Sequence, residues 1–148
     1  MPSRRLTVSV AALLVAGSLA ACGSGDPEVS VTAGATATSA PAEGAELDAA
    51  GFAAALKLPD TTIIDVRTPQ EYAEGHLPGA VNIDVSSADF VQQVQALDPT
   101  APYAVYCRSG NRSAAAIQEM SQLGFTNAYH LQGGITAWDG AGGEVVTG

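Results

Sequence analysis

The stretch APYAVYCRSGNRS, residues 101–113, joins a short apolar segment to a polar loop. Its residues 103–106 are apolar and follow a proline, a pattern typical of a buried β-strand. Cys107 comes directly after this strand, and beyond Ser113 apolar residues recur at the spacing of a helix. The stretch therefore predicts a strand, a tight loop and a helix, with a thiol at the point where the strand ends.

The loop that follows Cys107 is suited to stabilising negative charge. Arg108 and Arg112 supply two positive charges, and the loop N–H groups and the helix N-terminus add unpaired donors. Such surroundings lower a cysteine pKa from about 8.5 to roughly 3.5–7.5, which favours the thiolate at neutral pH. Gly110 lets the backbone turn back toward the sulfur. We expect a nucleophile in an anion-binding loop rather than a buried structural cysteine, because two arginines do not suit a core site.

Residues 107–113 resemble the active-site loop of the rhodanese family of sulfurtransferases and match it at every position. That loop reads Cys, a basic residue, a small residue, Gly, any residue, a basic residue, then Ser or Thr. The resemblance implies that Cys107 is the catalytic nucleophile. It implies that the substrate-binding residues are Arg108, Ser109, Gly110, Asn111, Arg112 and Ser113. The Cys-x4-Arg spacing is that of a loop carrying sulfur, whereas the Cys-x5-Arg loops of tyrosine phosphatases and of phosphatases with a rhodanese fold are wider and fit phosphate.

Residues 65–83, DVRTPQEYAEGHLPGAVNI, carry a second resemblance, to the N-terminal signature of rhodaneses. The one departure is Leu77, which stands where the signature has Ile. We expect Asp65 and Arg67 to support the site rather than to take part in the chemistry. Arg67 and Glu71 are four residues apart on a predicted helix turn and could form an ion pair.

Residues 132–138, QGGITAW, resemble the end of a rhodanese domain, which has a Gly-Gly turn and a helix that carries Trp. We expect Trp138 to pack in the core and His130, at a strand end, to be structural.

His76 could be a general base or a loop residue that hydrogen-bonds to the backbone. The second interpretation is favoured because the rhodanese family uses no histidine base.

The rest of the chain alternates between strand and helix patterns. In order these are a helix capped by Asp48, a strand at 61–66, a helix capped by Ser86 or Ser87, and a strand at 125–131. The alternation predicts the α/β class, with a central parallel sheet flanked by helices. The resemblance makes this a single rhodanese-like domain over residues 45–141, followed by a C-terminal tail at 142–148. Parallel sheets place ligand sites at the carboxyl ends of their strands, which is where Cys107 falls.

The N-terminus has the pattern of an export signal. A short basic start precedes an apolar run at 6–20, which is too short to span a bilayer. Residues 19–22, LAAC, resemble the end of a bacterial lipoprotein signal, so we expect a signal peptide at 1–21 and lipidation of Cys22. This predicts a protein of the bacterial cell envelope, exported and anchored in the membrane by lipid. An ordinary secretory peptide cut near Ala21 and a retained membrane helix are the alternatives.

Residues 22–44 predict a disordered tether. From residue 23 onward this segment has no Leu, Ile or aromatic residue and is rich in Ala, Thr, Ser, Gly and Pro. If Cys22 carries lipid, Cys107 is the only free thiol in the chain and cannot form an internal disulfide.

The charge balance restricts the partners. The chain has 6 basic and 15 acidic residues, a net charge of −9, which disfavours nucleic-acid binding. The sequence has no metal-ligand cluster and no dinucleotide-binding glycine pattern, so we expect neither a metal nor a cofactor. The expected partners are a small sulfur-containing anion, a thiol or cyanide acceptor and the membrane, and we expect a monomer.

Two functions of different classes follow. The first is a sulfurtransferase that moves a sulfane sulfur, as in thiosulfate, to a thiophilic acceptor through a persulfide on Cys107. The second is an exported module that binds or senses persulfide sulfur with little turnover. The intact Cys107 favours the enzyme over inactive forms of the module. A phosphatase or arsenate reductase is disfavoured by the length of the loop.

Overall fold

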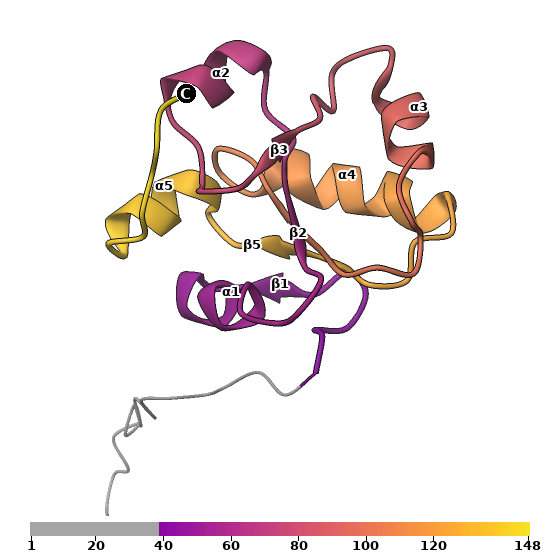
Figure 1. Cartoon of the computed structure of the whole chain (residues 1–148), viewed down its shortest axis with the longest axis horizontal. Coiled ribbons are helices and arrows are strands. Elements are labelled where there is room, and N and C mark those ends of the chain that lie inside the picture. The colour runs from indigo at the N-terminus through magenta and orange to yellow at the C-terminus, as the bar shows by residue number, and fades with distance from the viewer. Residues whose placement is uncertain (1–38) are drawn as a thin grey trace, which may run out of the picture. The chain divides into compact units, whose positions relative to one another are not determined.

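The computed structural model describes residues 39–148. The predicted signal peptide, Cys22 and the tether as far as residue 38 lie outside the described residues. The strands are β1 (Glu46–Leu47), β2 (Thr62–Asp65), β3 (Val81–Asn82), β4 (Tyr103–Tyr106) and β5 (Ala128–Leu131). They form one sheet of 5 strands in the order β1-β5-β4-β2-β3 (Figure 1). Every neighbouring pair is parallel, so the carboxyl ends of all the strands lie at one edge of the sheet.

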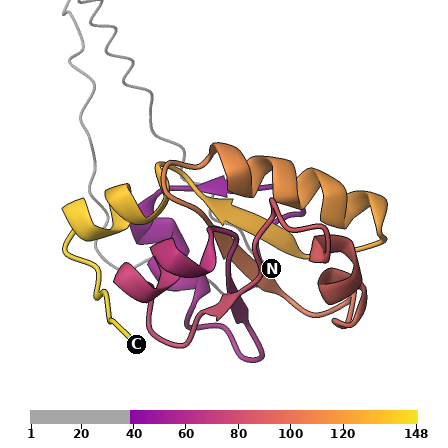
Figure 2. The same cartoon turned by 90° about the horizontal axis from the view of Figure 1, so that it is seen from above.

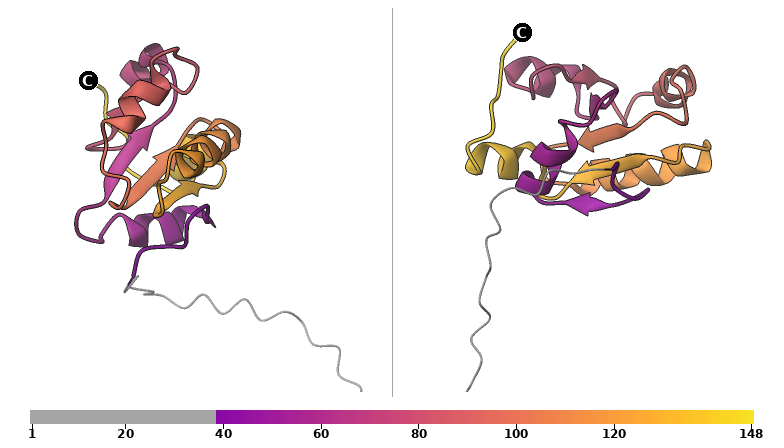
Figure 3. Two further views of the ribbon diagram at one scale, coloured as in Figure 1. Left: turned by 90° about the vertical axis from the view of Figure 1, so that its right-hand side faces the viewer. Right: turned by 60° about the horizontal axis from the view of Figure 1, so that its bottom comes forward.

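Four helices connect successive strands, α1 (Ala49–Ala55), α2 (Pro69–Glu74), α3 (Phe90–Gln95) and α4 (Asn111–Gln122), and α5 (Gly134–Gly140) follows β5. They cover both faces of the sheet, and α4, the longest, runs along β5 (Figures 2 and 3). In the described part of the chain, no helix is long and apolar enough to cross a membrane. This architecture confirms the predicted α/β domain with a central parallel sheet.

The alternation of side chains along β4 divides the core in two. Val105 and Cys107 point to one face, where they pack with residues of α3 and α4 such as Phe90 and Ile117. Ala104 and Tyr106 point to the opposite face, where α1, α2 and α5 pack. A parallel strand covered on both faces explains why residues 103–106 read as a continuous apolar run. It also places the sulfur on the α4 side of the sheet.

The helix caps agree with the sequence prediction at α1 and differ at α3. The Asp48 carboxylate accepts a hydrogen bond from Gly51 N–H at 2.7 Å, as expected for an N-cap. The residue at the N-cap of α3 is Asp89, and its side chain makes no capping hydrogen bond. Ser87 instead accepts from Asp89 N–H, and Ser86 turns back to Asp84, so neither serine caps the helix as predicted.

Contacts of the domain extend past both of its predicted limits. Gly44 N–H donates to the carbonyl of Ala128 at 2.7 Å, and the Glu43 carboxylate accepts from Ala128 N–H at 2.6 Å. At the other end, the backbones of His76 and Val146 exchange two hydrogen bonds of 2.9 Å. Composition alone does not reveal such backbone pairing, so the sequence pattern places residues 43–44 in the tether and residue 146 in a tail.

Candidate active site

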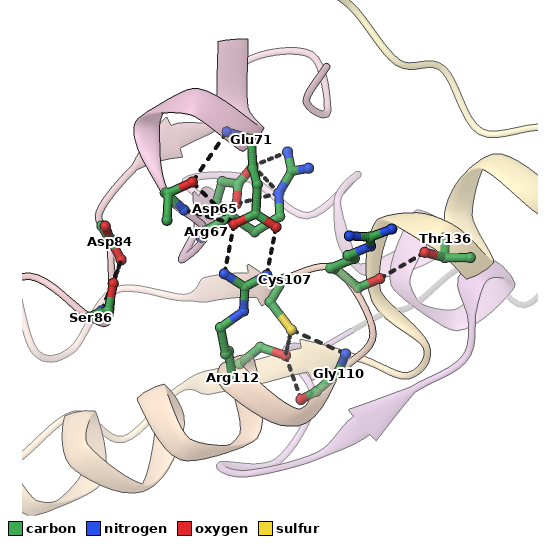
Figure 4. A network of polar contacts seen from close by, with 12 residues as sticks. Asp65, Arg67, Glu71, Asp84, Ser86, Cys107, Gly110, Arg112 and Thr136 are labelled. Carbon is green, nitrogen blue, oxygen red and sulfur yellow. Dashed lines mark hydrogen bonds and ion pairs between the residues drawn. The ribbon is translucent and has the colours of Figure 1, made fainter. Parts of the chain in front are cut away.

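The sulfur of Cys107 lies inside the loop between β4 and α4 (Figure 4). Cys107 is completely buried, with an exposed fraction of 0%. Gly110 has a φ of +101°, a conformation that favours glycine, and its N–H donates to the Cys107 sulfur at 3.1 Å. The Ser113 hydroxyl lies 3.6 Å from the same sulfur. The loop therefore curls around the thiol and presents donors to it, as the sequence predicts for an anion-binding loop.

These donors shift the titration of the thiol. Burial opposes ionisation, but hydrogen bonds from the Ser113 side chain and from the N–H groups of Ser113, Ser109 and Gly110 outweigh it. The net result is that the pKa of Cys107 is lowered. The positive end of the α4 dipole lies beside the loop, because α4 begins at Asn111. The loop therefore makes the Cys107 thiol easier to ionise than an ordinary cysteine.

The two arginines of the loop have different roles. The side chain of Arg108 is exposed, and its carbonyl accepts hydrogen bonds from the Thr136 hydroxyl at 3.0 Å and from Thr136 N–H at 3.3 Å. Arg112 is half-buried, and both of its terminal nitrogens donate to the carboxylate of Glu71 at 2.7 Å. Ser109 and Asn111, the other two polar residues between Cys107 and Ser113, are exposed. Arg108 is thus the cation of the loop that faces solvent, whereas Arg112 is held by α2.

Glu71 is a site residue that sequence reasoning placed wrongly. The Arg112 guanidinium holds the pKa of Glu71 at about 2, below its ordinary value of 4.5. The same carboxylate completes a capping box at the start of α2, where it accepts from Thr68 N–H at 3.2 Å. The spacing of Thr68 and Glu71 in the sequence predicts this cap, but no local pattern predicts a partner 41 residues away.

Arg67 pairs with Asp65 and not with Glu71, so the ion pair predicted between Arg67 and Glu71 is absent. Asp65 and Arg67 are buried and joined by several hydrogen bonds, the shortest at 2.5 Å. Arg67 also donates to the carbonyl of Gly75 at 2.6 Å, and Asn82 donates to the carbonyls of both Asp65 and Arg67. These contacts tie the end of β2 to the turn before β3. They place Asp65 and Arg67 as structural supports beside Glu71 and the loop (Figure 4).

The start of α5 lies directly against the Cys107 loop. Ile135 N–H donates to the carbonyl of Cys107 at 2.8 Å. Gly134 has a φ of +59°, and a Cβ at this position would lie 2.3 Å from that same carbonyl oxygen. Only glycine allows this close approach. The Gly-Gly turn at the start of α5 therefore packs against the backbone of the Cys107 loop and supports it.

The two histidines differ in their relation to the site. The ring of His76 stacks on Tyr72 with centroids 3.7 Å apart, and its Nδ1 lies 3.0 Å from the Tyr72 carbonyl. This is the backbone-bonded role favoured from the sequence. His130 lies closer to the chemistry than its expected structural role implies, because its Nδ1 is 3.4 Å from the Ser113 hydroxyl. In residues 39–148, no group of three or more His, Cys, Asp or Glu side chains could hold a metal ion.

A groove of about 330 Å³ lies beside the loop, between α2, α5 and the C-terminal residues. It is lined by Arg67, Glu71, Glu74, Gly75, Ile135, Thr136, Asp139 and Val145. Thr136 connects the groove to the loop through its hydrogen bonds to the Arg108 carbonyl. A small molecule that approaches the loop from this side therefore passes three carboxylates, Glu71, Glu74 and Asp139, and two apolar side chains.

A parallel sheet that holds a buried thiol of lowered pKa between β4 and α4 defines an α/β domain with a candidate active site at the carboxyl edge of the sheet. Residues 48–141 match the Rhodanese-like domain, and the chain belongs to that family. This confirms the resemblance seen in the sequence.

Relatives of known name support the same assignment. Thiosulfate sulfurtransferase GlpE from Pseudomonas entomophila (strain L48) is 39% identical over 87 residues, which cover 58% of this chain and 77% of that protein. The protein of the same name from Pseudomonas aeruginosa (strain UCBPP-PA14) is 42% identical over 77 residues, covering 51% and 67%.

The fold of this chain is similar to that of solved rhodanese-like structures. A rhodanese-related protein from Thermoplasma volcanium has a TM-score of 0.63 and 36% identity, and the match covers 70% of this chain and 99% of that one. The Rhodanese-like domain of the Alr3790 protein from Anabaena sp. has a TM-score of 0.63 and 28% identity, with 69% and 78% covered.

Proposed function

We propose that this domain is a rhodanese-type sulfurtransferase that carries sulfane sulfur as a persulfide on Cys107. The observation that carries the proposal is the buried Cys107 sulfur, which accepts a hydrogen bond from Gly110 N–H at 3.1 Å in a loop that lowers its pKa. The names of the relatives that share about two fifths of the aligned residues point to the same activity.

In the first step the Cys107 thiolate attacks the outer sulfur of a donor such as thiosulfate. A bond forms between the Cys107 sulfur and this sulfur atom, and the S–S bond of thiosulfate breaks, with its electron pair leaving on sulfite. The negative charge of the thiolate leaves on sulfite, and the persulfide keeps the charge that its outer sulfur already carried in thiosulfate. The N–H groups of Ser109, Gly110 and Ser113, which already favour the thiolate, lie where they can stabilise that charge.

In the second step an acceptor removes the outer sulfur. Cyanide or a thiolate attacks it, the persulfide S–S bond breaks, and the electron pair returns to Cys107 as thiolate. The products are thiocyanate, or a new persulfide on the acceptor thiol. No proton has to move in either step when the reactants are ionised, which agrees with a site whose sulfur has Ser113 rather than a histidine as its side-chain neighbour.

The geometry around Arg112 favours sulfur over phosphorus as the transferred element. A phosphate group, whose negative charge is delocalised over its oxygens, is bound best by a guanidinium that donates two N–H hydrogen bonds to it. Both terminal nitrogens of Arg112 are instead bound to Glu71 at 2.7 Å. Because Cys107 is completely buried, the site also favours a small reacting group, such as a terminal sulfur atom, over the bulkier phosphate ester. Arg108, whose side chain is exposed, is the cation available to attract the donor anion.

The experiment is a comparison of three reactions on the purified protein. Thiosulfate and cyanide should yield thiocyanate with the natural sequence and none above background with Cys107→Ser, because the serine cannot form a persulfide. Hydrolysis of a phosphate ester should stay at background for both proteins. Rapid phosphate hydrolysis without thiocyanate formation would overturn the proposal, and a folded protein that takes up sulfur without turnover would favour the binding or sensing module.

We also propose that the protein acts in the bacterial cell envelope, held there by lipid on Cys22. The support is the order of a basic start, an apolar run and the residues 19–22 in the sequence. A tether between residue 22 and the domain would let the site reach small sulfur compounds near the membrane surface.

A further inference from the structure

His130 is a buried titratable residue for which the proposed reaction has no use. It lies in β5, with an exposed fraction of 7%. In the sheet it is paired with Val105 of β4 on one side and with Glu46 of β1 on the other. Residues paired in this way point to the same face, so His130 lies on the α4 side together with Val105, two residues before Cys107. The imidazole reaches Ser113 at the first turn of α4, where its Nδ1 is 3.4 Å from the hydroxyl oxygen.

The Ser113 hydroxyl is the point at which several hydrogen bonds compete. It has one proton and three neighbouring acceptors: the Gly110 carbonyl at 2.9 Å, His130 Nδ1 at 3.4 Å and the Cys107 sulfur at 3.6 Å. The proton can serve only one strong acceptor at a time. If His130 Nδ1 is unprotonated, the sulfur competes with two other acceptors for the Ser113 proton. If Nδ1 carries a proton, the sulfur competes only with the Gly110 carbonyl.

We propose that His130 is a positioning residue that carries its proton on Nδ1 and donates it to the Ser113 hydroxyl oxygen. This removes His130 as an acceptor and leaves the Ser113 proton to the Gly110 carbonyl or to the sulfur. When Cys107 becomes a thiolate or a persulfide anion, its full charge draws that proton from the neutral carbonyl. His130 thus acts on the thiol through Ser113 and helps to stabilise the charged sulfur.

The surroundings of His130 favour this form. Burial lowers its pKa, and the nearby Glu46 carboxylate on β1 opposes that effect, so the neutral ring predominates at neutral pH. In the described part of the chain, the side-chain hydrogen bonds of His130 involve Nδ1 and not Nε2. A proton on Nε2 would leave Nδ1 as an acceptor that competes with the Gly110 carbonyl and the sulfur for the single Ser113 proton. A proton on Nδ1 has the Ser113 oxygen to receive it.

The test is the pKa of Cys107, measured from the ultraviolet absorbance of the thiolate in full-length chains that carry Cys22→Ser, so that Cys107 is the only thiol. His130→Leu should raise the Cys107 pKa by about 0.5–1 unit, a roughly 3- to 10-fold smaller thiolate fraction below that pKa. His130→Asn should restore the original value, because its amide nitrogen can take the place of Nδ1 as a donor. An unchanged pKa in His130→Leu would overturn the proposal, as would an equal shift in both variants.

A double substitution tests whether His130 acts through Ser113. Ser113→Ala should raise the Cys107 pKa, and adding His130→Leu should raise it no further, since the hydroxyl that connects them is gone. If the two effects simply add, His130 acts on the sulfur by another route and the proposal is wrong.

A third measurement needs no change at His130. The two ring nitrogens of His130 in the natural sequence can be followed by nitrogen NMR at neutral pH, which distinguishes the tautomers. We expect the proton on Nδ1, and a proton on Nε2 would contradict the proposal even if the His130 variants fail to fold. The inference rests on Cys107 as the reacting sulfur of the proposed function, but none of these readouts needs a sulfur donor. Each idea can therefore fail without the other.

Discussion

At the scale of single residues, the ion pair between Arg112 and Glu71 connects the Cys107 loop to α2. The pair is partly exposed, with 36% and 24% of the two side chains accessible, and each guanidinium nitrogen meets its own carboxylate oxygen at 2.7 Å. This geometry fixes Arg112 as a support of the loop. It also explains why the sequence predicted the cation but not its role, because Arg67 is the nearer partner of Glu71 along the chain and is held by Asp65 instead.

Glu71→Gln should destabilise the domain in a way that depends on pH. Since the folded protein lowers the pKa of Glu71 from 4.5 to about 2, the pair stabilises the fold fully above pH 4.5 and loses that contribution as the pH falls toward 2. We expect the substitution to reduce the free energy of unfolding by about 1 kcal/mol at neutral pH, because the pair is partly exposed to solvent. Denaturant unfolding at about pH 7 and about pH 3 measures the difference, which should be clearly smaller at the lower pH.

The matched control is Glu74→Gln, on the same helix. Glu74 is exposed and its hydrogen bond is a long one, to Gln70 at 3.4 Å. The Glu74→Gln variant should unfold at the same denaturant concentration as the natural protein at both pH values. A loss of stability equal to that of Glu71→Gln would mean that the charge of α2, and not the contact with Arg112, is responsible.

The residues of the site show what a sequence can and cannot predict at this scale. Cys107, Gly110 and Ser113 were predicted together because they lie within one loop, where local geometry follows from spacing. The contacts that connect distant segments, such as Ser113 with His130, could not be predicted, since they depend on the register of β5 against β4. His130 lies on the α4 face because of that register, and nothing in residues 125–131 alone reveals it.

At the scale of elements, the loop between β4 and α4 depends on the start of α5 beneath it. Strand, loop and helix were predicted from residues 101–113, and the Gly-Gly turn from residues 132–138. The reason for the second glycine is visible only in three dimensions, where Gly134 packs against the backbone of Cys107 and Arg108. The short edge strand β1 was missed, because its two residues carry no strand pattern of their own and are ordered by pairing with β5.

Gly134→Ala should displace the Cys107 loop. A Cβ would lie 2.3 Å from the Cys107 carbonyl oxygen and 2.5 Å from the carbonyl carbon of Arg108, and the φ of +59° is unfavourable for alanine. We expect a loss of stability of several kcal/mol or, in a folded variant, a Cys107 pKa closer to that of a free thiol. Thermal unfolding and the ultraviolet titration of the thiol measure the two effects.

Gly140→Ala is the control, at the other end of the same helix. A Cβ there would meet no atom within 4 Å, so the variant should be as stable as the natural protein or slightly more stable. If Gly134→Ala were equally harmless in both measurements, the loop would not depend on this contact.

At the scale of the whole molecule, the folded domain begins before residue 45. A chain shortened to begin at Ala42 keeps the two hydrogen bonds that Glu43 and Gly44 make with Ala128, whereas one that begins at Ala45 loses both. We expect the shorter chain to be less stable by about 1–3 kcal/mol, because the Ala128 backbone groups lose their partners. Denaturant unfolding of the two chains measures this, and equal midpoints would show that residues 43–44 contribute nothing.

The proposed anchor makes a separate prediction. Cys22→Ser should leave an unlipidated precursor, because serine lacks the thiol that receives the lipid. Membrane fractionation and the mass of the N-terminal peptide should both change relative to the natural sequence. Unchanged fractionation and an unchanged modification pattern would rule out lipidation at Cys22, while leaving the domain and its chemistry untouched.

The measurement that tests the central claim most directly is the intact mass of the purified protein after brief treatment with thiosulfate. One sulfur atom, about 32 mass units, should be added to the natural sequence and removed again by cyanide, in keeping with a covalent carrier. Cys107→Ser should gain nothing. A correctly folded natural protein that gains no mass, or gains it equally in Cys107→Ser, would contradict the assignment of Cys107 as the carrier of sulfur.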